Sequence, residues 1–469
     1  MPHKIVLYNP KSTFYTMPLA LMALGSALDR ARFEVQIIDG RLEADPVAAV
    51  VAACEEALCL GVTVLSGNPI HDALAVTRAV KAAHPTLPTV WGGWHPSLFP
   101  TETLAEPSID VTVQGQGEVT FGELADRFAA GESVQGVAGI AHRVAEGTVQ
   151  EAPRPLLPMD ALPAHDYSLI DVERYFELKG ERQLDYISST GCFFRCAFCA
   201  DPFVFKRKWV GLSPARMGEE IELLWRRYHF TDLSFQDETF FTYPNRVAAI
   251  AEEFLRRGLR FSWTGTLRAD QGHRMDDATL DLCVRAGLRR VMIGVESGSQ
   301  EMMDWLQKDI KVEQVLESAE RCVKHGIGAI FPFIVGFPGE SDASVQASLE
   351  MVKRLRKMSP QFETPIFYFK PYPGSRITQE VVERGYQLPQ TLEEWGDFDY
   401  IGSSGPWVSA GTYQRIERFK FYNRFAGGPE TWLRRPLQQI ARWRCQRDWY
   451  HFPIEKLVVE RLKPLPSLS

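Results

Sequence analysis

The sequence predicts an α/β protein with a doubly wound N-terminal domain, a partial (β/α)6 barrel and a small, mostly helical C-terminal segment. Three observations predict this organisation. Short apolar strands alternate with helical stretches in two successive series, a proline-containing stretch separates the series, and the end of the chain is rich in basic and aromatic residues. At 469 residues, with 45% hydrophobic and 24% charged residues, the chain is long enough for two or three folded domains.

The first series covers residues 1–140. We expect strands at residues 5–8, 33–40, 58–64, 89–93 and 111–113, with helices at 18–31 and 69–83. Strands that alternate with helices form a parallel sheet, and such a sheet binds its ligand beyond the carboxyl ends of its strands. The residues expected at that edge include Asp39, Ser66, Gly92, Gly93 and His95.

Residues 141–182 are predicted to be a linker, because prolines interrupt any helix and the apolar periodicity fades. The second series covers residues 183–400, with strands expected at 185–189, 232–235, 260–264, 290–295, 329–335 and 365–368. Helices are expected to begin at Ser213, Asn245, Asp277, Lys311 and Ser341. About six βα units form an open or partial barrel, whose chemistry lies at the carboxyl ends of its strands.

The C-terminal segment, residues 401–469, has its own composition. Between Tyr413 and Lys463, twelve Lys or Arg stand against five acidic residues, a local charge of +7. Trp432, Trp443, Trp449 and Tyr450 are interleaved with these charges. The pattern has two interpretations: peripheral contact with an anionic, amphipathic or membrane-associated partner, or a basic helical cap whose aromatic side chains pack on the barrel.

Charge and cysteine content exclude several classes of protein. The net charge of −7 argues against nucleic acid as a bulk partner. The N-terminus lacks a signal-peptide pattern and no apolar stretch has the length of a membrane span, so we expect a cytoplasmic protein. Eight cysteines are too few for a disulfide scaffold.

Three of the cysteines form a cluster, CxxxCxxC, directly after a predicted strand: Cys192, Cys196 and Cys199. Three thiolates this close can converge on one metal site, whereas iron–sulfur clusters and closed zinc sites usually take four protein ligands. The motif therefore leaves one position open. The alternative is packed thiols or a zinc site completed from afar, and we expect the other five cysteines to be core residues.

The motif resembles that of the radical S-adenosylmethionine (SAM) superfamily, CxxxCxφC with φ aromatic, matched by Cys192, Cys196, Phe198 and Cys199. The resemblance implies a 4Fe-4S cluster whose open iron is chelated by the amino and carboxylate groups of SAM. It further implies reductive cleavage of SAM to a 5'-deoxyadenosyl radical. The electron would come from an external low-potential reductant such as flavodoxin or ferredoxin, and the enzyme would be oxygen-sensitive.

The resemblance extends over about residues 183 to 380 and implies SAM contacts near successive strand ends. Asp237 or Glu238 would bind the SAM amino group, although the superfamily's usual Gly-Gly-Glu is absent. Arg268 would pair with the SAM carboxylate, and Glu296 would contact the ribose and amino group. The remaining implied contacts are Phe198, Gly336 near adenine and Tyr372 in a closing loop.

The N-terminal domain resembles the Rossmann-like cobalamin-type domain of cobalamin-dependent radical SAM enzymes, on the segments Gly92-Gly93-Trp94-His95-Pro96 and Gly115-Gln116-Gly117. That group includes carbon and phosphorus methyltransferases, hopanoid methylases and the anaerobic magnesium-protoporphyrin monomethyl ester cyclase. The implied cobalamin contacts are Asp39, Ser66, Gly92, Gly93, His95 and Gly115. Asp39-Gly40-Arg41 lacks the histidine that ligates cobalt in many cobalamin proteins, which implies base-off cobalamin. His95 is also interpretable as a side chain that orders its loop.

The leading hypothesis is a cobalamin-dependent radical SAM enzyme that methylates an unactivated carbon of a small-molecule or lipid-like substrate. One alternative keeps the cofactors but performs a cyclase-like oxidation on a tetrapyrrole or other apolar ring. A second alternative is a non-enzymatic, metal-stabilised scaffold. A nucleic-acid-modifying radical SAM enzyme is a third, and the acidic charge balance argues against it.

Overall fold

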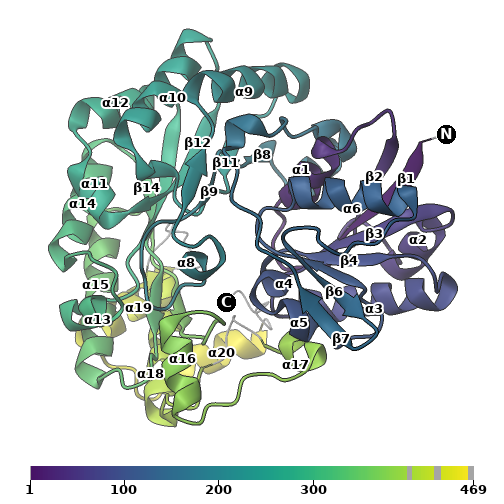
Figure 1. Cartoon of the computed structure of the whole chain (residues 1–469). Coiled ribbons are helices and arrows are strands. Elements are labelled where there is room, and N and C mark those ends of the chain that lie inside the picture. The colour runs from purple at the N-terminus through teal and green to yellow at the C-terminus, as the bar shows by residue number, and fades with distance from the viewer. Residues whose placement is uncertain (1, 399–403, 427–434, 463–469) are drawn as a thin grey trace.

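The structure is a computed structural model that describes residues 2–398, 404–426 and 435–462. Two units, each built on a parallel sheet, face each other across the middle of the molecule, with the N-terminal unit on the right of Figure 1 and the barrel on the left. The predicted α/β class and the order of its parts are confirmed. No helix in the described ranges has the length and apolar character needed to cross a membrane.

The N-terminal sheet has the strand order β2-β1-β3-β4-β5-β6-β7. Its strands are β1 (His3–Asn9), β2 (Phe33–Asp39), β3 (Ala57–Thr63), β4 (Thr89–Gly92), β5 (Val111–Val113), β6 (Ile140–Val144) and β7 (Gly147–Gln150). The first five are parallel, whereas β6 and β7 add an antiparallel edge. The strand order reverses between β1 and β3, and a doubly wound sheet opens its ligand crevice at such a point.

Helices cover both faces of this sheet (Figure 1). They are α1 (Leu19–Ala27), α2 (Pro46–Ala53), α3 (Pro69–Ala83), α4 (Trp94–Leu98), α5 (Pro100–Thr103) and α6 (Glu118–Ala130). Helix α1 contacts α6 on one side, and α2 contacts α3. The expected helix over 18–31 was too long, because the Asp29 carboxylate accepts a hydrogen bond from Ala31 N and turns the chain toward β2.

The connection between the units contains the 3-10 helices η1 (Met159–Ala161) and η2 (Tyr167–Leu169) and the helix α7 (Val172–Lys179). Residues 151–158, where three of the prolines lie, have no regular structure. Because β6 and β7 pair with the N-terminal sheet, that sheet extends past residue 140 to Gln150.

The barrel is a partial one, with six parallel strands in the order β16-β14-β13-β12-β11-β8. They are β8 (Gln183–Tyr186), β11 (Asp232–Phe235), β12 (Ser262–Arg268), β13 (Leu288–Gly294), β14 (Gly328–Ile330) and β16 (Phe362–Glu363). The expected strand over 329–335 is split before β15 (Phe333–Val335), since Pro332 has no N–H to donate to a ladder. Strand β15 pairs instead with β17 (Ile366–Tyr368).

Most of the barrel helices lie outside the sheet, along the top and left of Figure 1. They are α9 (Pro214–Tyr228), η3 (Phe240–Thr242), α10 (Pro244–Arg256), α11 (Ala269–Arg274), α12 (Asp277–Arg285), α13 (Gln300–Trp305), α14 (Val312–Lys324), α15 (Asp342–Met358) and α16 (Arg376–Glu383). Outward-facing Leu184, Leu233 and Trp263 belong to the same apolar core as the inner faces of α9 and α10.

A short helix of the second half, α17 (Leu392–Gly396), returns to the N-terminal unit and packs on α3. Leu392, Trp395 and Phe398 join the apolar core of that unit. The backbone N–H of Gly67 donates to the carbonyl of Trp395 over 3.1 Å. The Arg78–Glu393 ion pair and a hydrogen bond between His71 and Asp397 flank this contact, so the chain crosses between its two units more than once.

The C-terminal helices are α18 (Ala410–Ala426), α19 (Arg435–Arg447) and α20 (Ile454–Leu462). Ile416, Phe419, Tyr422, Cys445 and Tyr450 are buried in the barrel's core, which favours the interpretation as a helical cap. The predicted boundary at residues 400 and 401, and Trp432, lie outside the described residues. The five cysteines expected in the core, 54, 59, 283, 322 and 445, are all buried.

Candidate active site

The three clustered cysteines lie on a loop that a short antiparallel pair closes at its base. Strand β9 (Ser189–Gly191) ends where the loop begins, and β10 (Trp209–Gly211) starts where it ends. Gly191 has φ +87, and a Cβ there would lie 2.3 Å from the carbonyl oxygen of Lys208, so only glycine allows the two strands this close. The closed base makes the cysteine loop a defined structure.

The thiols suit a cluster better than a single metal ion. Cys192, Cys196 and Cys199 are all partly buried, and burial raises the pKa of Cys192 to about 11. Within the described residues, no three His, Cys, Asp or Glu side chains lie close enough to hold one metal ion. In a 4Fe-4S cluster each thiolate binds a different iron, so its ligands are spaced more widely. Three sulfur donors therefore fit such a cluster with one iron left open.

Arg268, at the carboxyl end of β12, holds the cysteine loop directly. Its Nη1 donates to the Cys196 sulfur over 3.6 Å, and its guanidinium lies 3.5 Å from the centre of the Phe194 ring. Its Nη2 donates to the carbonyl of Lys308 over 2.6 Å. This places a positive charge against the cysteine sulfurs, where thiolates need it.

Asp237 and Glu238 follow β11 but have different surroundings. Asp237 is buried and accepts hydrogen bonds from Ser188 N (2.7 Å), Ser188 Oγ (2.6 Å) and Ser189 Oγ (2.5 Å), so it anchors the strand that leads into the cysteine loop. Glu238 accepts one hydrogen bond, from Gly191 N over 3.1 Å. Burial raises the pKa of Glu238 to about 8. Of the two predicted carboxylates, Glu238 is the one with oxygen atoms left for a ligand.

Glu296 forms a buried ion pair with Lys308, a residue that sequence reasoning missed. Glu296 has a left-handed backbone, φ +64, two residues after the end of β13. The Lys308 ammonium also lies 5.9 Å from the centre of the Phe198 ring, beside the cysteine loop. A lone lysine after a helix carries no distinguishing signal in one sequence, so only the fold identifies it.

Phe198 and Gly336 are brought together by an apolar cluster. Phe198 packs against Phe337 at 6.4 Å between ring centres, and Phe337 packs against Phe369 at 4.8 Å. The carbonyl of Gly336, which has φ +74, accepts a hydrogen bond from Trp407 Nε1 over 2.6 Å. Tyr372 lies elsewhere, packed toward the core of the N-terminal unit.

At the edge of the N-terminal sheet, Ser66 and His95 are paired, with 3.0 Å between Oγ and Nδ1. His95 is 1% exposed, and burial lowers its pKa to about 4. The rings of Phe99 and Trp395 lie 5.4 and 5.5 Å from the His95 ring. This geometry agrees with a histidine that orders its loop.

The three glycines at this edge differ in how much free space surrounds their backbone. Gly93 has φ +95, and a Cβ would lie 2.9 Å from the backbone of Val64. Gly115 also has a positive φ, but nothing lies within 4 Å of its Cβ position, and Gly92 has only ordinary contacts. The backbone at Gly92 and Gly115 can therefore approach a ligand closely.

Asp39, predicted at the same edge, is already occupied by protein partners. Its carboxylate pairs with Arg41 and accepts hydrogen bonds from Tyr175 Oη (2.6 Å) and Asn9 Nδ2 (3.0 Å). Burial alone would raise the pKa of the Asp39 carboxyl. The Arg41 guanidinium beside it nevertheless holds that pKa below its usual range. Because Tyr175 belongs to α7, Asp39 ties the connecting helix to β2.

The cysteine loop and the N-terminal edge touch across the interface. Phe205, just after α8 (Asp201–Val204), packs edge-on against Trp94 with 5.8 Å between ring centres. Trp94 directly follows Gly92 and Gly93, and helices α4 and α8 are in contact. The two predicted cofactor-binding regions, far apart in the sequence, are therefore neighbours in space.

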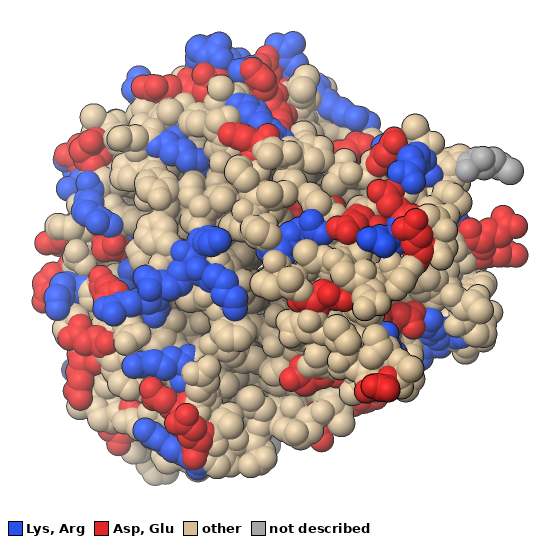
Figure 2. All heavy atoms as spheres, viewed as in Figure 1, with Lys and Arg blue, Asp and Glu red and all other residues tan. Residues whose placement is uncertain are grey.

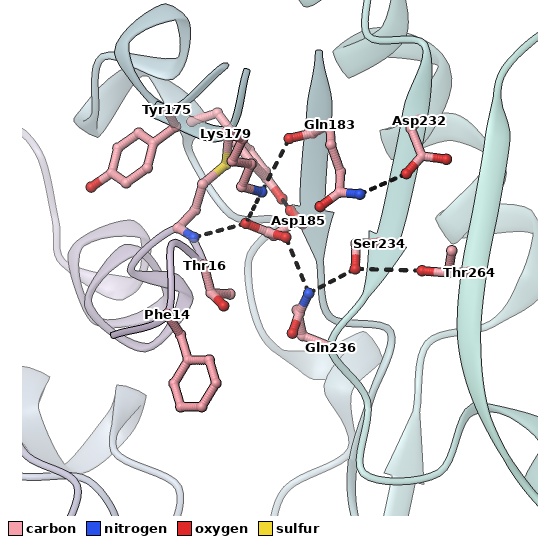
Figure 3. A network of polar contacts seen from close by, with 12 residues as sticks. Phe14, Thr16, Tyr175, Lys179, Gln183, Asp185, Asp232, Ser234, Gln236 and Thr264 are labelled. Carbon is pink, nitrogen blue, oxygen red and sulfur yellow. Dashed lines mark hydrogen bonds and ion pairs between the residues drawn. The ribbon is translucent and has the colours of Figure 1, made fainter. Parts of the chain in front are cut away.

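A polar network on the inner face of the barrel sheet joins the two units (Figure 3). The Asp185 carboxylate accepts hydrogen bonds from Lys179 Nζ (2.5 Å), Met17 N (2.8 Å) and Gln236 Nε2 (3.1 Å). Gln236 also donates to Ser234 Oγ over 2.9 Å. Because strand side chains alternate, this polar face is the one opposite to α9 and α10.

Comparison with known proteins agrees with this geometry. Residues 186–352 match the Radical SAM superfamily, and residues 5–125 match the B12 binding domain. An uncharacterized methyltransferase of Pyrococcus horikoshii is 29% identical, with 82% of each chain covered. The anaerobic magnesium-protoporphyrin IX monomethyl ester cyclase of Rubrivivax gelatinosus is 27% identical, covering 67% of this chain and 57% of the cyclase.

Among solved structures, the fold is similar to that of the radical S-adenosylmethionine methyltransferase TsrM from Kitasatospora setae, with cobalamin and a [4Fe-4S] cluster bound. The TM-score is 0.71 at 19% sequence identity, covering 82% of this chain and 75% of TsrM. The family match over residues 186–352 identifies a domain of the radical SAM superfamily in this enzyme. Within that superfamily it belongs to the class that also carries a cobalamin-binding domain, and its cofactors are a 4Fe-4S cluster, SAM and cobalamin. The scaffold alternative is not supported.

Proposed function

We propose that this enzyme methylates an unactivated carbon of a small-molecule substrate. The contact between Trp94 and Phe205 carries the proposal, because it brings the cobalamin-binding edge and the cysteine loop to one interface. The similarity to the Pyrococcus horikoshii methyltransferase supports it. A methyl donor and a radical source must reach the same carbon, which requires such an arrangement.

The chain's own residues have separable tasks in this proposal. Cys192, Cys196 and Cys199 would hold the cluster, and Arg268 would fix their loop. When bound, the cluster and SAM supply the radical that abstracts hydrogen, and cobalamin supplies the methyl group.

Other side chains would position SAM and protect the reaction. Glu238 and the Glu296–Lys308 pair are the ionisable groups beside the cysteine loop that would face the amino and carboxylate groups of SAM. Phe198, Phe337, Phe369 and Trp407 would exclude water from the reaction. On the N-terminal side, we assign the ligand-facing backbone to Gly92 and Gly115, with Gly93, Ser66 and His95 ordering the loop.

The test is anaerobic reconstitution with iron and sulfide, followed by SAM, dithionite and hydroxocobalamin. Mass spectrometry measures 5'-deoxyadenosine and S-adenosylhomocysteine. We expect both products, the second only with cobalamin, and we expect deoxyadenosine to disappear in Cys196→Ala. If the unaltered protein, fully loaded with cluster, forms neither product, the proposal is wrong.

A cyclase-like oxidation of an apolar ring is a second candidate, favoured by the similarity to the Rubrivivax gelatinosus cyclase. The same experiment separates the two reactions. Deoxyadenosine without cobalamin-dependent S-adenosylhomocysteine would favour the cyclase-like reaction, because that reaction needs no methyl transfer.

A further inference from the structure

We propose that an exposed basic turn, Lys206-Arg207-Lys208, is the docking surface for an acidic one-electron donor protein that reduces the iron–sulfur cluster. The inference rests on the proposed function, since it requires a cluster on the cysteine loop. It goes beyond that function by assigning the surface through which the reducing electron enters.

The basic turn is exposed and locally concentrated. All three side chains are exposed, and basic side chains gather on the visible face of the molecule in the region of α8 (Figure 2). Lys206 and Arg207 have φ +50 and +56, a left-handed backbone at two successive non-glycine residues. This conformation is unfavourable for such residues, and surrounding structure must maintain it.

The turn belongs to the cysteine loop itself. Arg207 Nε donates to the carbonyl of Phe193, the residue after Cys192, over 3.2 Å. The Lys206 ammonium lies 4.5 Å from the centre of the Phe203 ring, and Phe203 is itself exposed. A partner seated here would lie within a few residues of the cysteines, which electron transfer requires because its rate falls steeply with distance.

The charge of the turn is only partly offset by its nearest carboxylate, because Asp309 is within electrostatic reach of Arg207 but forms its ion pair with another residue. The nearby carboxylate of Asp309 is engaged by Arg195, with both N–O distances 2.9 Å. Among the described residues, no acidic side chain forms an ion pair with Lys206, Arg207 or Lys208. The whole chain has a net charge of −7. An acidic partner would therefore be repelled by most of the surface and oriented toward this turn.

The electron balance is simple. One electron passes from the reduced cofactor of the donor to the oxidised cluster, so the donor is oxidised and the cluster reduced by one electron. No bond between the two proteins forms, and no atom is transferred.

The test compares two double variants with the same change of charge. Lys206→Glu/Lys208→Glu alters the turn. The control, Arg354→Glu/Lys357→Glu, alters two exposed residues near the end of α15. This helix begins after the carboxyl end of β15 and leads back to the start of β16, so its last turn lies at the end of the barrel opposite to the cysteine loop. With cluster-loaded protein, stopped-flow absorbance measures cluster reduction by photoreduced flavodoxin at low and high salt.

We expect the turn variant to be reduced about tenfold more slowly at low salt, with the difference shrinking at high salt, and the α15 variant to change less than about twofold. Equal slowing in both variants, or none in either, would overturn the docking surface. Excess dithionite should reduce all three proteins and give equal deoxyadenosine, which shows that the turn variant is intact. If dithionite reduces the cluster but no protein forms deoxyadenosine, the proposed function fails while the docking measurement remains valid.

Discussion

At the scale of single residues, the pair Asp237 and Glu238 shows how hydrogen bonding separates neighbouring carboxylates. Both follow a strand in the sequence, which could not distinguish them, because the difference arises from Ser188 and Ser189 at the start of β9 and just before it. Arg268 and Glu296 were predicted for the same reason, their position at strand ends. Lys308 was not predicted as a site residue, because only its neighbours in the folded chain mark it as one.

We expect Asp237→Ala to lower the free energy of unfolding by about 3 kcal/mol, because three buried donors lose their acceptor. Glu238→Ala loses one hydrogen bond and should cost about 1 kcal/mol. Urea denaturation measures both. A larger loss for the Glu238 variant would contradict the anchoring role of Asp237.

The buried imidazole of His95 predicts a pH dependence of stability. Its pKa is about 4 in the folded protein and 6.5 for an unperturbed histidine, so protons bind preferentially to the unfolded chain. The stabilisation is complete above pH 6.5 and is lost as the pH falls toward 4, by about 3 kcal/mol in total.

His95→Gln should therefore make the stability profile less steep between pH 6.5 and 4, measured by urea denaturation at several pH values. Burial also lowers the pKa of His165 to about 4, so part of the slope remains. His3→Gln, at an exposed histidine, is the control. The same slope in both variants would show that His95 is not responsible.

At the scale of elements, most strands of the two parallel sheets were predictable because buried strands form short apolar runs. The sixth barrel strand was not, because β16 has only two residues, and the strand expected at 365–368 pairs with β15 in a separate sheet. The antiparallel strand pairs could not be predicted. Strand β7 is exposed throughout, so it has no apolar pattern, and β9 and β10 have three residues each, too few for a period. The base of the cysteine loop was therefore invisible in the sequence although the cysteines were not.

The contact between α7 and β8 depends on the buried Lys179–Asp185 pair shown in Figure 3. Asp185→Ala should lower the free energy of unfolding by about 3–5 kcal/mol, because it leaves a buried ammonium without its partner. Asp126→Ala, which breaks the exposed Arg32–Asp126 pair, should cost no more than about 1 kcal/mol. Urea denaturation measures the free energy of unfolding of both variants. If both lose a comparable amount, the Asp185 network stabilises the fold no more than a surface ion pair does.

At the scale of the whole molecule, α17 fastens the second half of the chain to the first. Neither its position nor its role was predictable, because Trp395 has no local pattern that marks it as part of a distant core. Its ring covers His95, so the helix closes the loop that follows β4. The predicted cobalamin-binding edge is thus completed by a segment that comes after the whole barrel in the sequence.

We expect Trp395→Ala to lower the free energy of unfolding by about 3–5 kcal/mol, because the indole is buried in the N-terminal core. Trp443→Ala, at a half-exposed tryptophan of α19, should cost clearly less. Thermal unfolding with each variant measures the difference. An equal fall in melting temperature would contradict the fastening role of α17.

The return of α17 restricts how such proteins can be recombined in evolution. A domain that is one continuous stretch of sequence can be exchanged between genes as a cassette. Here an exchange of residues 1–150 alone would import a sheet fitted to another helix, leaving Trp395 and Phe398 facing a foreign surface. Successful exchanges must replace α17 together with the N-terminal unit, so these two distant stretches of sequence should be inherited as a pair.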